Sequence, residues 1–289
     1  MPSYEELPTE EVDPEGPDLD LLPPAEVARV LLGEEAKAHA AVRDAIEAIG
    51  KACAAAAAAL HAGGRLLYVG AGTSGRLGAL DAAEMGPTFG AAPGQVVARI
   101  AGGARALTES VEGAEDDEDA GRRDLGSTTE RDCTVGITMS GTAAYVRGAL
   151  AAARGARVLV TANPDSAIPA EIRVVLDLGP EALAGSTRLK GGSATKAVLN
   201  MISTAAMAAS GAVYKNLMVR VRPVNRKLRA RAERLVERIA NVPRTRAGEL
   251  LRAGGDDVRV AVLMARGLSR EDAEAALRAS RGSLREALS

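Results

Sequence analysis

Aromatic residues are almost absent from this chain of 289 residues, which contains one Phe, four Tyr and no Trp. A platform that stacks the bases of single-stranded nucleic acid needs several aromatic side chains, and so does a cage for a quaternary ammonium group. The formal net charge is −2, so the chain also lacks the overall positive charge of a typical nucleic-acid-binding protein. We therefore expect no nucleic-acid partner, and a core built from aliphatic side chains.

Metal ligands and disulfide partners are equally scarce, because the chain has two Cys (Cys53 and Cys133) and two His (His39 and His61). These numbers argue against a disulfide framework and against a Cys/His zinc site, so we expect no bound metal. No apolar run is long enough to cross a bilayer, and the acidic, Pro-rich start does not resemble a signal peptide. We expect a cytoplasmic protein with no membrane partner.

Short β-prone runs alternate with segments of helical composition in the middle of the chain. Apolar strands separated by helices are typical of a parallel sheet whose two faces are both covered. We therefore predict an α/β fold with a doubly wound, mostly parallel five-stranded sheet, N-terminal helices and a small C-terminal helical module. Ligands bind such sheets beyond the carboxyl ends of the strands. The predicted strands lie at 65–69, 95–100, 133–138, 157–160 and 172–178.

Composition divides the chain into three predicted parts. They are an N-terminal arm with helices at 1–61, an α/β domain with the helices that follow it at 62–240, and a small helical module at 241–289. From residue 192 to the end we expect helices only.

The first part combines an acidic arm with a long helical segment. Residues 1–24 are rich in Pro and in carboxylates such as Glu5 and Glu6, and they fit an extended arm and a disordered segment equally well. Helical composition covers 25–61, where Gly33 and Gly50 are expected to break the helix.

A Gly-rich loop at 70–76 is the sharpest local signal, because it follows a predicted strand and precedes a helix expected at 77–84. Glycines permit a tight turn, and backbone N–H groups at a helix start attract an anion. A dinucleotide site would need a carboxylate at the end of the second strand, where the sequence reads Ile100-Ala-Gly-Gly103. We favour a phosphate cradle, with a dinucleotide site and a structural turn as weaker alternatives. Its candidate residues are Gly72, Thr73, Ser74, Gly75 and Arg76.

Two further hydroxyl-rich turns precede helices. The first contributes the candidates Ser140, Gly141 and Thr142, and the second contributes Ser186, Thr187 and Lys190. Each turn alone is more often a helix cap than a binding site. Three such turns in one α/β domain favour a shared phosphorylated ligand.

Carboxylates are the main candidates for acid–base chemistry, since His is so rare. Glu84 ends the helix after the Gly-rich loop, and Glu115 lies in an acidic run at 112–119. Most such side chains form solvated faces, and an acidic run is less often a Mg²⁺ site. A Glu beside a phosphate-binding loop can nevertheless have a raised pKa and transfer protons near neutral pH.

Together these motifs resemble the N-acetylmuramic acid 6-phosphate etherase family of the sugar isomerase (SIS) superfamily. The resemblance covers nearly the whole chain and implies that 62–240 contains an SIS phosphosugar-binding domain. The matching stretches are GRLLYVGAGTSGRLGALDAAE (64–84), GPTFG (86–90), IAGGARAL (100–107), VEGAED (111–116), GSTRLKGGSATKAVLNM (185–201) and NLMV (216–219).

The resemblance implies an activity. Such enzymes cleave the D-lactyl ether of N-acetylmuramic acid 6-phosphate to N-acetylglucosamine 6-phosphate and D-lactate, by β-elimination and then hydration. It implies that Glu84, in the L-D-x-x-E motif, is the acid and that Glu115, the second Glu of E-G-A-E, is the base. It also implies a phosphorylated amino sugar as ligand, a homodimer, and no metal or organic cofactor.

The second loop departs from the family, which usually shows S-G-R-T-P-Y where this chain has Ser140-Gly-Thr-Ala-Ala-Tyr145. The change removes a positive charge and a phosphate donor. It keeps two alternatives open: a non-catalytic phosphosugar-binding regulator, and an SIS aldose–ketose isomerase.

Overall fold

The computed structural model describes residue 7 and residues 9–289, so Glu5 and Glu6 of the arm lie outside the described residues. The chain forms two compact units. The first contains the residues up to Ala82 together with Gly94–Ser203, and the second contains Ala83–Pro93 together with Thr204–Ser289. The division into three parts at 1–61, 62–240 and 241–289 stays a prediction. The two compact units differ from it in that the N-terminal helices and the sheet belong to the same unit.

The first unit contains a five-stranded parallel sheet in the order β2-β1-β3-β4-β5, which confirms the predicted fold class. In the pairing of β1 with β3, Gly70 lies opposite Ile137, so both strands end at the same level. The loops that follow them therefore start side by side. The strands are β1 (Leu66–Gly70), β2 (Val96–Ile100), β3 (Cys133–Ile137), β4 (Ala156–Thr161) and β5 (Ile172–Val175).

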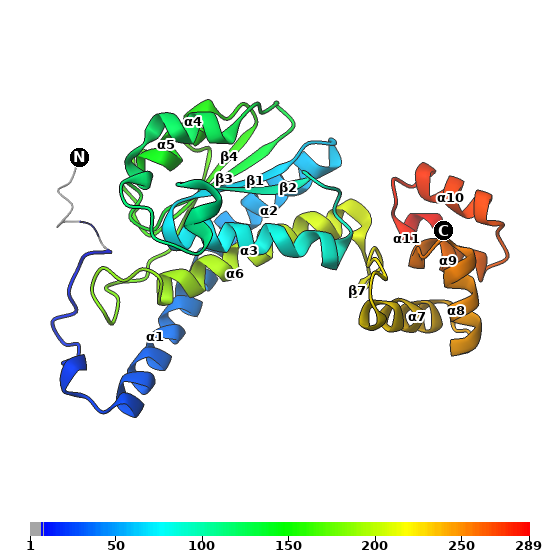
Figure 1. The fold of residues 1–289 in the computed structure, drawn as a ribbon, viewed down its shortest axis with the longest axis horizontal. Helices are drawn as coiled ribbons and strands as arrows, with labels where there is room; N and C mark the ends of the chain where they lie inside the picture. Colours follow the sequence, from blue (N-terminus) through cyan, green and yellow to red (C-terminus); the bar gives the residue numbers. More distant parts are fainter. Residues whose placement is uncertain (1–6, 8) are drawn as a thin grey trace. The chain divides into compact units, whose positions relative to one another are not determined.

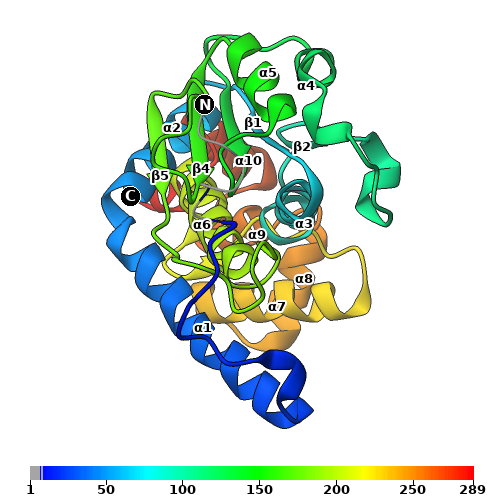
Figure 2. The ribbon, with the colours of Figure 1, turned by 90° about the vertical axis from the view of Figure 1, so that its left-hand side faces the viewer.

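Helices cover both faces of the sheet (Figures 1 and 2). Leu67 and Val69 of β1 point to one face, where they pack with residues of α4 (Glu118–Leu125) and α5 (Ala144–Ala152). Tyr68 points to the other face and meets Gly78 of α3 (Gly72–Phe89). This alternation along one strand is what a sheet buried on both sides requires.

The backbones of α4 and α5 touch. A Cβ atom added to Gly121 would lie 1.9 Å from the Tyr145 carbonyl oxygen, and one added to Gly148 would lie 2.0 Å from the Glu118 carbonyl oxygen. Any side chain at either glycine would therefore push the helices apart. Arg147 adds an ion pair, in which its Nη2 lies 2.7 Å from Glu118 Oε2.

Two helices precede the sheet, and their bounds differ from the prediction. α1 (Pro24–Asp44) and α2 (Ile46–His61) run through Gly33 and Gly50, and the chain bends at Ala45 instead. Gly has a low helix propensity, but a single Gly costs only about 1 kcal/mol, which the rest of a long helix offsets. Before α1, Leu19–Leu21 forms a short 3₁₀ helix, η2.

The second unit is a small helical module with one hairpin. The expectation of helices only was wrong, because β6 (Val213–Tyr214) and β7 (Leu217–Met218) pair antiparallel around a turn in which Lys215 has a φ of 56°. A hairpin this short leaves too little periodicity to detect. Its helices are α7 (Arg226–Ala240), α8 (Arg244–Ala253), α9 (Val258–Met264), α10 (Arg270–Ala279) and α11 (Leu284–Ala287).

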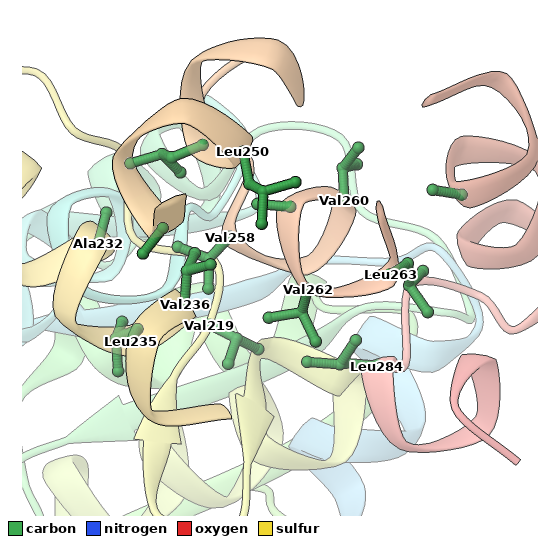
Figure 3. Close-up of a cluster of buried hydrophobic side chains, with 14 of the residues drawn as sticks. Val219, Ala232, Leu235, Val236, Leu250, Val258, Val260, Val262, Leu263 and Leu284 are labelled. Carbon is green, nitrogen blue, oxygen red and sulfur yellow. The ribbon is translucent and has the colours of Figure 1, made fainter. Parts of the chain in front are cut away.

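Aliphatic side chains from these helices and from the segment after the hairpin form the core of the second unit (Figure 3). Asn225 and Ser269 cap α7 and α10, accepting hydrogen bonds from Leu228 N and Asp272 N. No helix in the described part of the chain is long and apolar enough to cross a membrane.

A buried carboxylate joins the amino ends of β1 and β3. Asp132 is 2% exposed and accepts hydrogen bonds of 2.8 Å from Arg65 N, Arg65 Nη2 and Thr129 N. Burial raises the pKa of this carboxyl, but the bonds from Arg65 and Thr129 lower it more, and the resulting pKa is about 2. Folding therefore stabilises the ionised form of the Asp132 carboxyl group.

Asp132→Asn should lower the free energy of unfolding by about 2 kcal/mol at pH 7, since each pKa unit corresponds to about 1.4 kcal/mol. A folded-state pKa below the unfolded value stabilises the protein above the unfolded pKa, and this contribution disappears as the pH falls through the folded one. Urea unfolding from pH 7 to pH 3 should show the difference from wild type shrinking below about pH 5. Asp20→Asn, at an exposed position, is the control; a pH-independent difference for Asp132→Asn would contradict this linkage.

Candidate functional site

The Gly-rich loop forms the first turn of α3. The helix begins at Gly72 rather than at the predicted Leu77, so Thr73 and Ser74 are helical. A Cβ atom on Gly75 would lie 2.7 Å from the Gly70 carbonyl oxygen, so glycine at Gly75 lets the helix start against the end of β1. The unpaired N–H groups of this first turn are left available to an anion.

The loop between β3 and α5 presents a chain of hydroxyl groups. Ser140 Oγ lies 3.3 Å from Thr138 Oγ1 and 2.9 Å from Thr142 Oγ1. Two side chains from beyond β4 hold the loop in place: Asn163 Nδ2 donates to the Ser140 carbonyl at 2.9 Å, and Ser166 Oγ donates to the Gly141 carbonyl at 2.6 Å. These two hydrogen bonds to the loop backbone therefore fix the positions of the loop hydroxyl groups.

These two loops line one cavity of about 250 Å³, which we call the hydroxyl pocket. It lies at the carboxyl edge of β1 and β3, where the register places both loops side by side. The third turn and the acidic run each add one residue. The pocket thereby gathers these predicted site residues: Gly72, Thr73, Ser74, Glu115, Ser140, Thr142 and Thr187.

The N-terminal arm also reaches the hydroxyl pocket, through Thr9 and Glu10. Thr9 is buried, and its carbonyl oxygen accepts a 3.1 Å hydrogen bond from Gly185 N. Sequence reasoning left this arm between an extended segment and a disordered one, and did not assign it to the site.

Glu115 forms part of the pocket wall from a short 3₁₀ helix, η4 (Ala114–Asp116). Partial burial raises the pKa of its carboxyl, and the negative charges of Asp116 and Glu112 raise it further. A second cavity of about 230 Å³ lies against the same wall, because Gly72 and Glu115 line both. Glu115 is exposed and lines both cavities, and its environment favours holding a proton more than that of a fully solvated Glu.

Two positively charged side chains that were predicted to bind phosphate contact other parts of the protein and do not line the pocket. Lys190 is buried and makes an ion pair with Glu34 of α1 and a hydrogen bond to the Pro180 carbonyl. Arg76 lines the second cavity, and its guanidinium donates to the carbonyl oxygens of Ala106 and Glu109. Both charges hold neighbouring segments, and neither residue lines the hydroxyl pocket.

The other predicted residues lie outside the lining of the hydroxyl pocket. Gly75 is buried against the backbone of Gly70, and Gly141 is buried against the side chains of Asn163 and Ser166. Ser186 precedes Thr187 without lining the cavity. Glu84 is exposed near the end of α3, more than three helical turns after Gly72, and belongs to the second compact unit.

A buried carboxylate behind the pocket was missed. Asp81 of α3 accepts hydrogen bonds from Tyr68 Oη at 2.8 Å, from Asn200 Nδ2 at 2.8 Å and from Ser203 Oγ at 3.1 Å. Asn200 and Ser203 belong to α6 (Lys190–Met207). Burial raises the pKa of Asp81 despite these bonds. The network joins β1, α3 and α6, and so positions the helix that begins at the Gly-rich loop.

No cluster of three or more His, Cys, Asp or Glu side chains that could hold a metal ion occurs among residue 7 and residues 9–289. The acidic run at 112–119 therefore has no metal-binding geometry there. What the hydroxyl pocket offers is hydroxyl groups, backbone N–H groups and two carboxylates, Glu10 and Glu115, of which Glu115 has a raised pKa.

Comparison with known proteins adds independent findings. Residues 48–154 match the family described as the glucokinase regulatory protein N-terminal SIS domain. A Gloeobacter violaceus protein named N-acetylmuramic acid 6-phosphate etherase is 49% identical over 271 residues, covering 91% of this chain and 89% of that protein. A Salmonella choleraesuis protein of the same name is 46% identical, with 98% of each chain covered.

A solved structure from Bacteroides fragilis, described as a candidate phosphosugar isomerase involved in capsule formation, superimposes with a TM-score of 0.50. It is 19% identical and covers 68% of this chain and 96% of its own. At that identity the likeness concerns the fold alone, and it agrees with the parallel sheet found here.

Ser140→Ala should weaken the binding of inorganic phosphate at the hydroxyl pocket by about tenfold, because one hydrogen bond to a charged group contributes about 1.5–3 kcal/mol. The measurement is a phosphate titration followed by the amide resonances of Thr73 and Ser74. Ser186→Ala, a hydroxyl outside the pocket lining, should leave the affinity unchanged. Equal losses in the two variants would show that the Ser140 hydroxyl is not a phosphate ligand.

Proposed function

The chain belongs to the N-acetylmuramic acid 6-phosphate etherase family, and from this membership we propose that it cleaves the D-lactyl ether of N-acetylmuramic acid 6-phosphate. The products are N-acetylglucosamine 6-phosphate and D-lactate. The protein is thus a carbon–oxygen lyase that acts on a phosphorylated amino sugar.

One observation within the molecule carries the proposal: Glu115 lines the same cavity as the hydroxyl groups of Thr73, Ser74, Ser140 and Thr142. Hydroxyl and N–H donors suit a phosphate group, which accepts several hydrogen bonds. A carboxylate a short distance away suits proton transfer at the sugar to which that phosphate is attached.

The proposed chemistry starts from the open-chain form of the sugar, whose aldehyde acidifies the hydrogen on C2. Glu115 accepts this proton, a double bond forms between C2 and C3, and the bond from C3 to the lactyl oxygen breaks. The departing oxygen takes a proton from an acid, for which we propose Glu84. Water then adds to C3 while a proton returns to C2, so the two carboxyl groups end in their initial states.

A raised pKa fits the role of Glu115, because a general base works best when its pKa approaches the operating pH. Glu84 is exposed, and its role rests on its place in the L-D-x-x-E motif. The steps transfer protons, break one carbon–oxygen bond at C3 and form another there, so they need no oxidant or reductant.

We also propose a homodimer. Apolar side chains at the N-terminal end of the chain lie open: Val12 is 73% exposed, Leu21 76% and Leu32 of α1 73%. A second copy covering these side chains would remove apolar surface from water, which favours association.

Glu115→Gln and Glu84→Gln should each lower the rate of D-lactate release at least about 100-fold, because a positioned general acid or base contributes about 10²–10⁴ in rate. The assay supplies purified protein with N-acetylmuramic acid 6-phosphate and quantifies D-lactate. Glu47→Gln is the control, since this exposed Glu of α2 lines neither cavity beside Glu115 and should leave the activity intact.

The same assay separates the proposed function from its alternatives. A regulator would bind the phosphosugar without releasing D-lactate, and an isomerase would give a product of unchanged mass. Full activity in Glu84→Gln alone would assign the acid to another group, whereas full activity in both variants would reject the two-carboxylate mechanism.

Asp116→Asn should shift the acid limb of the kcat/KM profile to lower pH. Glu115 must be ionised to act as base, and the negative charge of Asp116 raises its pKa, so removing that charge lowers the pH at which activity appears. Asp119→Asn, at an exposed position on α4, should leave the limb in place. A shift toward higher pH in Asp116→Asn would contradict this electrostatic coupling.

A further inference from the structure

The second unit contains a cavity of about 470 Å³ that the proposed etherase reaction does not use. Its walls are Gly90, the segment Val219–Val224 that follows the hairpin, the turn Gly255–Asp257 and Arg259. Part of the wall is aliphatic, and Val219 belongs to the core of this unit (Figure 3). The polar part consists of three arginines and two aspartates, so we call it the arginine cavity.

Arg220 has no anionic partner. No carboxylate of residue 7 or residues 9–289 forms an ion pair with its guanidinium, whose Nη2 donates to the Ser210 carbonyl at 2.8 Å. Its Nε is buried and has no hydrogen-bond partner. Burial and the nearby charge of Arg259 lower the pKa of Arg220 more than the negative charge of Asp257 raises it, so its surroundings disfavour the positive charge. A half-buried cation without a partner is costly, and a bound anion would remove that cost.

Packing holds Arg220 in this position. A Cβ atom added to Gly282 would lie 2.4 Å from Arg220 Nη2 and 3.1 Å from Arg259 Nη1, so both guanidinium groups converge on that glycine. Arg259 also donates to the Gly282 carbonyl at 3.2 Å.

Each aspartate of the cavity makes its ion pair with an arginine other than Arg220 and Arg222. Asp257 pairs with Arg259, whose Nη2 lies 2.6 Å from Asp257 Oδ2. Asp256 is held at both oxygens by Arg229, at 2.9 and 3.0 Å. Arg222, which is exposed, makes no side-chain hydrogen bond or ion pair within the described part of the chain. Arg220 and Arg222 therefore have no ion-pair partner among the described residues, although Asp257 is near enough to act on the charge of Arg220.

We propose that the arginine cavity binds a phosphate monoester of a small polyhydroxy compound, as a second ligand site distinct from the hydroxyl pocket. The guanidinium groups of Arg220 and Arg222 would hold the phosphate, because Arg matches the geometry and charge of that group. A carboxylate has more acceptor positions than one Arg occupies, so Asp256 and Asp257 can accept hydrogen bonds from ligand hydroxyls.

The test uses the full chain with labelled Val methyl groups, titrated separately with sn-glycerol 3-phosphate and with methyl phosphate. Methyl resonances of Val219 and Val221 should shift and saturate, and glycerol 3-phosphate should bind more tightly because methyl phosphate has no hydroxyl groups. Arg222→Gln and Arg220→Gln should each weaken binding by about tenfold or more. Arg238→Gln, an exposed arginine of α7 outside the cavity, should not.

Absence of saturable shifts at Val219 and Val221 would overturn the proposal, and so would equal affinities in Arg222→Gln and Arg238→Gln. Equal binding of the two esters would overturn the role given to Asp256 and Asp257. Arg222 is exposed, so its variant tests the site even if Arg220→Gln fails to fold. The signals come from the second unit and involve no lactate assay, so the result is independent of the proposed function.

Discussion

The parallel pairing of β1 with β3 is the constraint on which the candidate site depends. Because Gly70 and Ile137 lie opposite each other, the two chains leave the sheet at one level and must both turn into helices there. The hydroxyl groups after each strand consequently face one cavity. At the other end of the same strands, Asp132 binds the backbone of Arg65 and fixes the register from behind. A shift of one residue would turn every buried side chain of β1 to the opposite face.

The positively charged side chains near the hydroxyl pocket stabilise the fold and do not line the pocket. The cations nearest in sequence to the phosphate-binding candidates, Arg76 and Lys190, are committed to carbonyl groups and to Glu34. None of the described residues that line the hydroxyl pocket is a Lys or Arg. A phosphate there would be held by N–H dipoles and hydroxyl groups. This agrees with a second loop that carries Thr142 where the family usually has Arg.

Sequence reasoning recovered what periodicity and glycine spacing encode, namely the five strands, their parallel arrangement and the loops that meet at one edge. It failed where the outcome depends on tertiary packing. Gly33 and Gly50 could not be recognised as helical, because long helices tolerate single glycines once one face is packed. The start of α3 was predicted too late. The helix begins at Gly72 because Gly75 packs closely against Gly70, and residue propensities do not reveal such a tertiary contact. Thr9 and Asp81 reach their partners only through the fold. Asp81 stands in the L-D-x-x-E motif, but the motif does not reveal that its side chain is buried.

The touching backbones of α4 and α5 have a mechanical consequence. Because Gly121 and Gly148 have no side chain, the two helix backbones are in direct contact, and we expect a displacement of one helix to displace the other. Glu115 lies just before α4, and Thr142 just before α5. We therefore expect these two walls of the hydroxyl pocket to move together. If the pocket widens to admit a ligand, we expect the change on the remaining sides, where the first turn of α3 and the N-terminal arm lie.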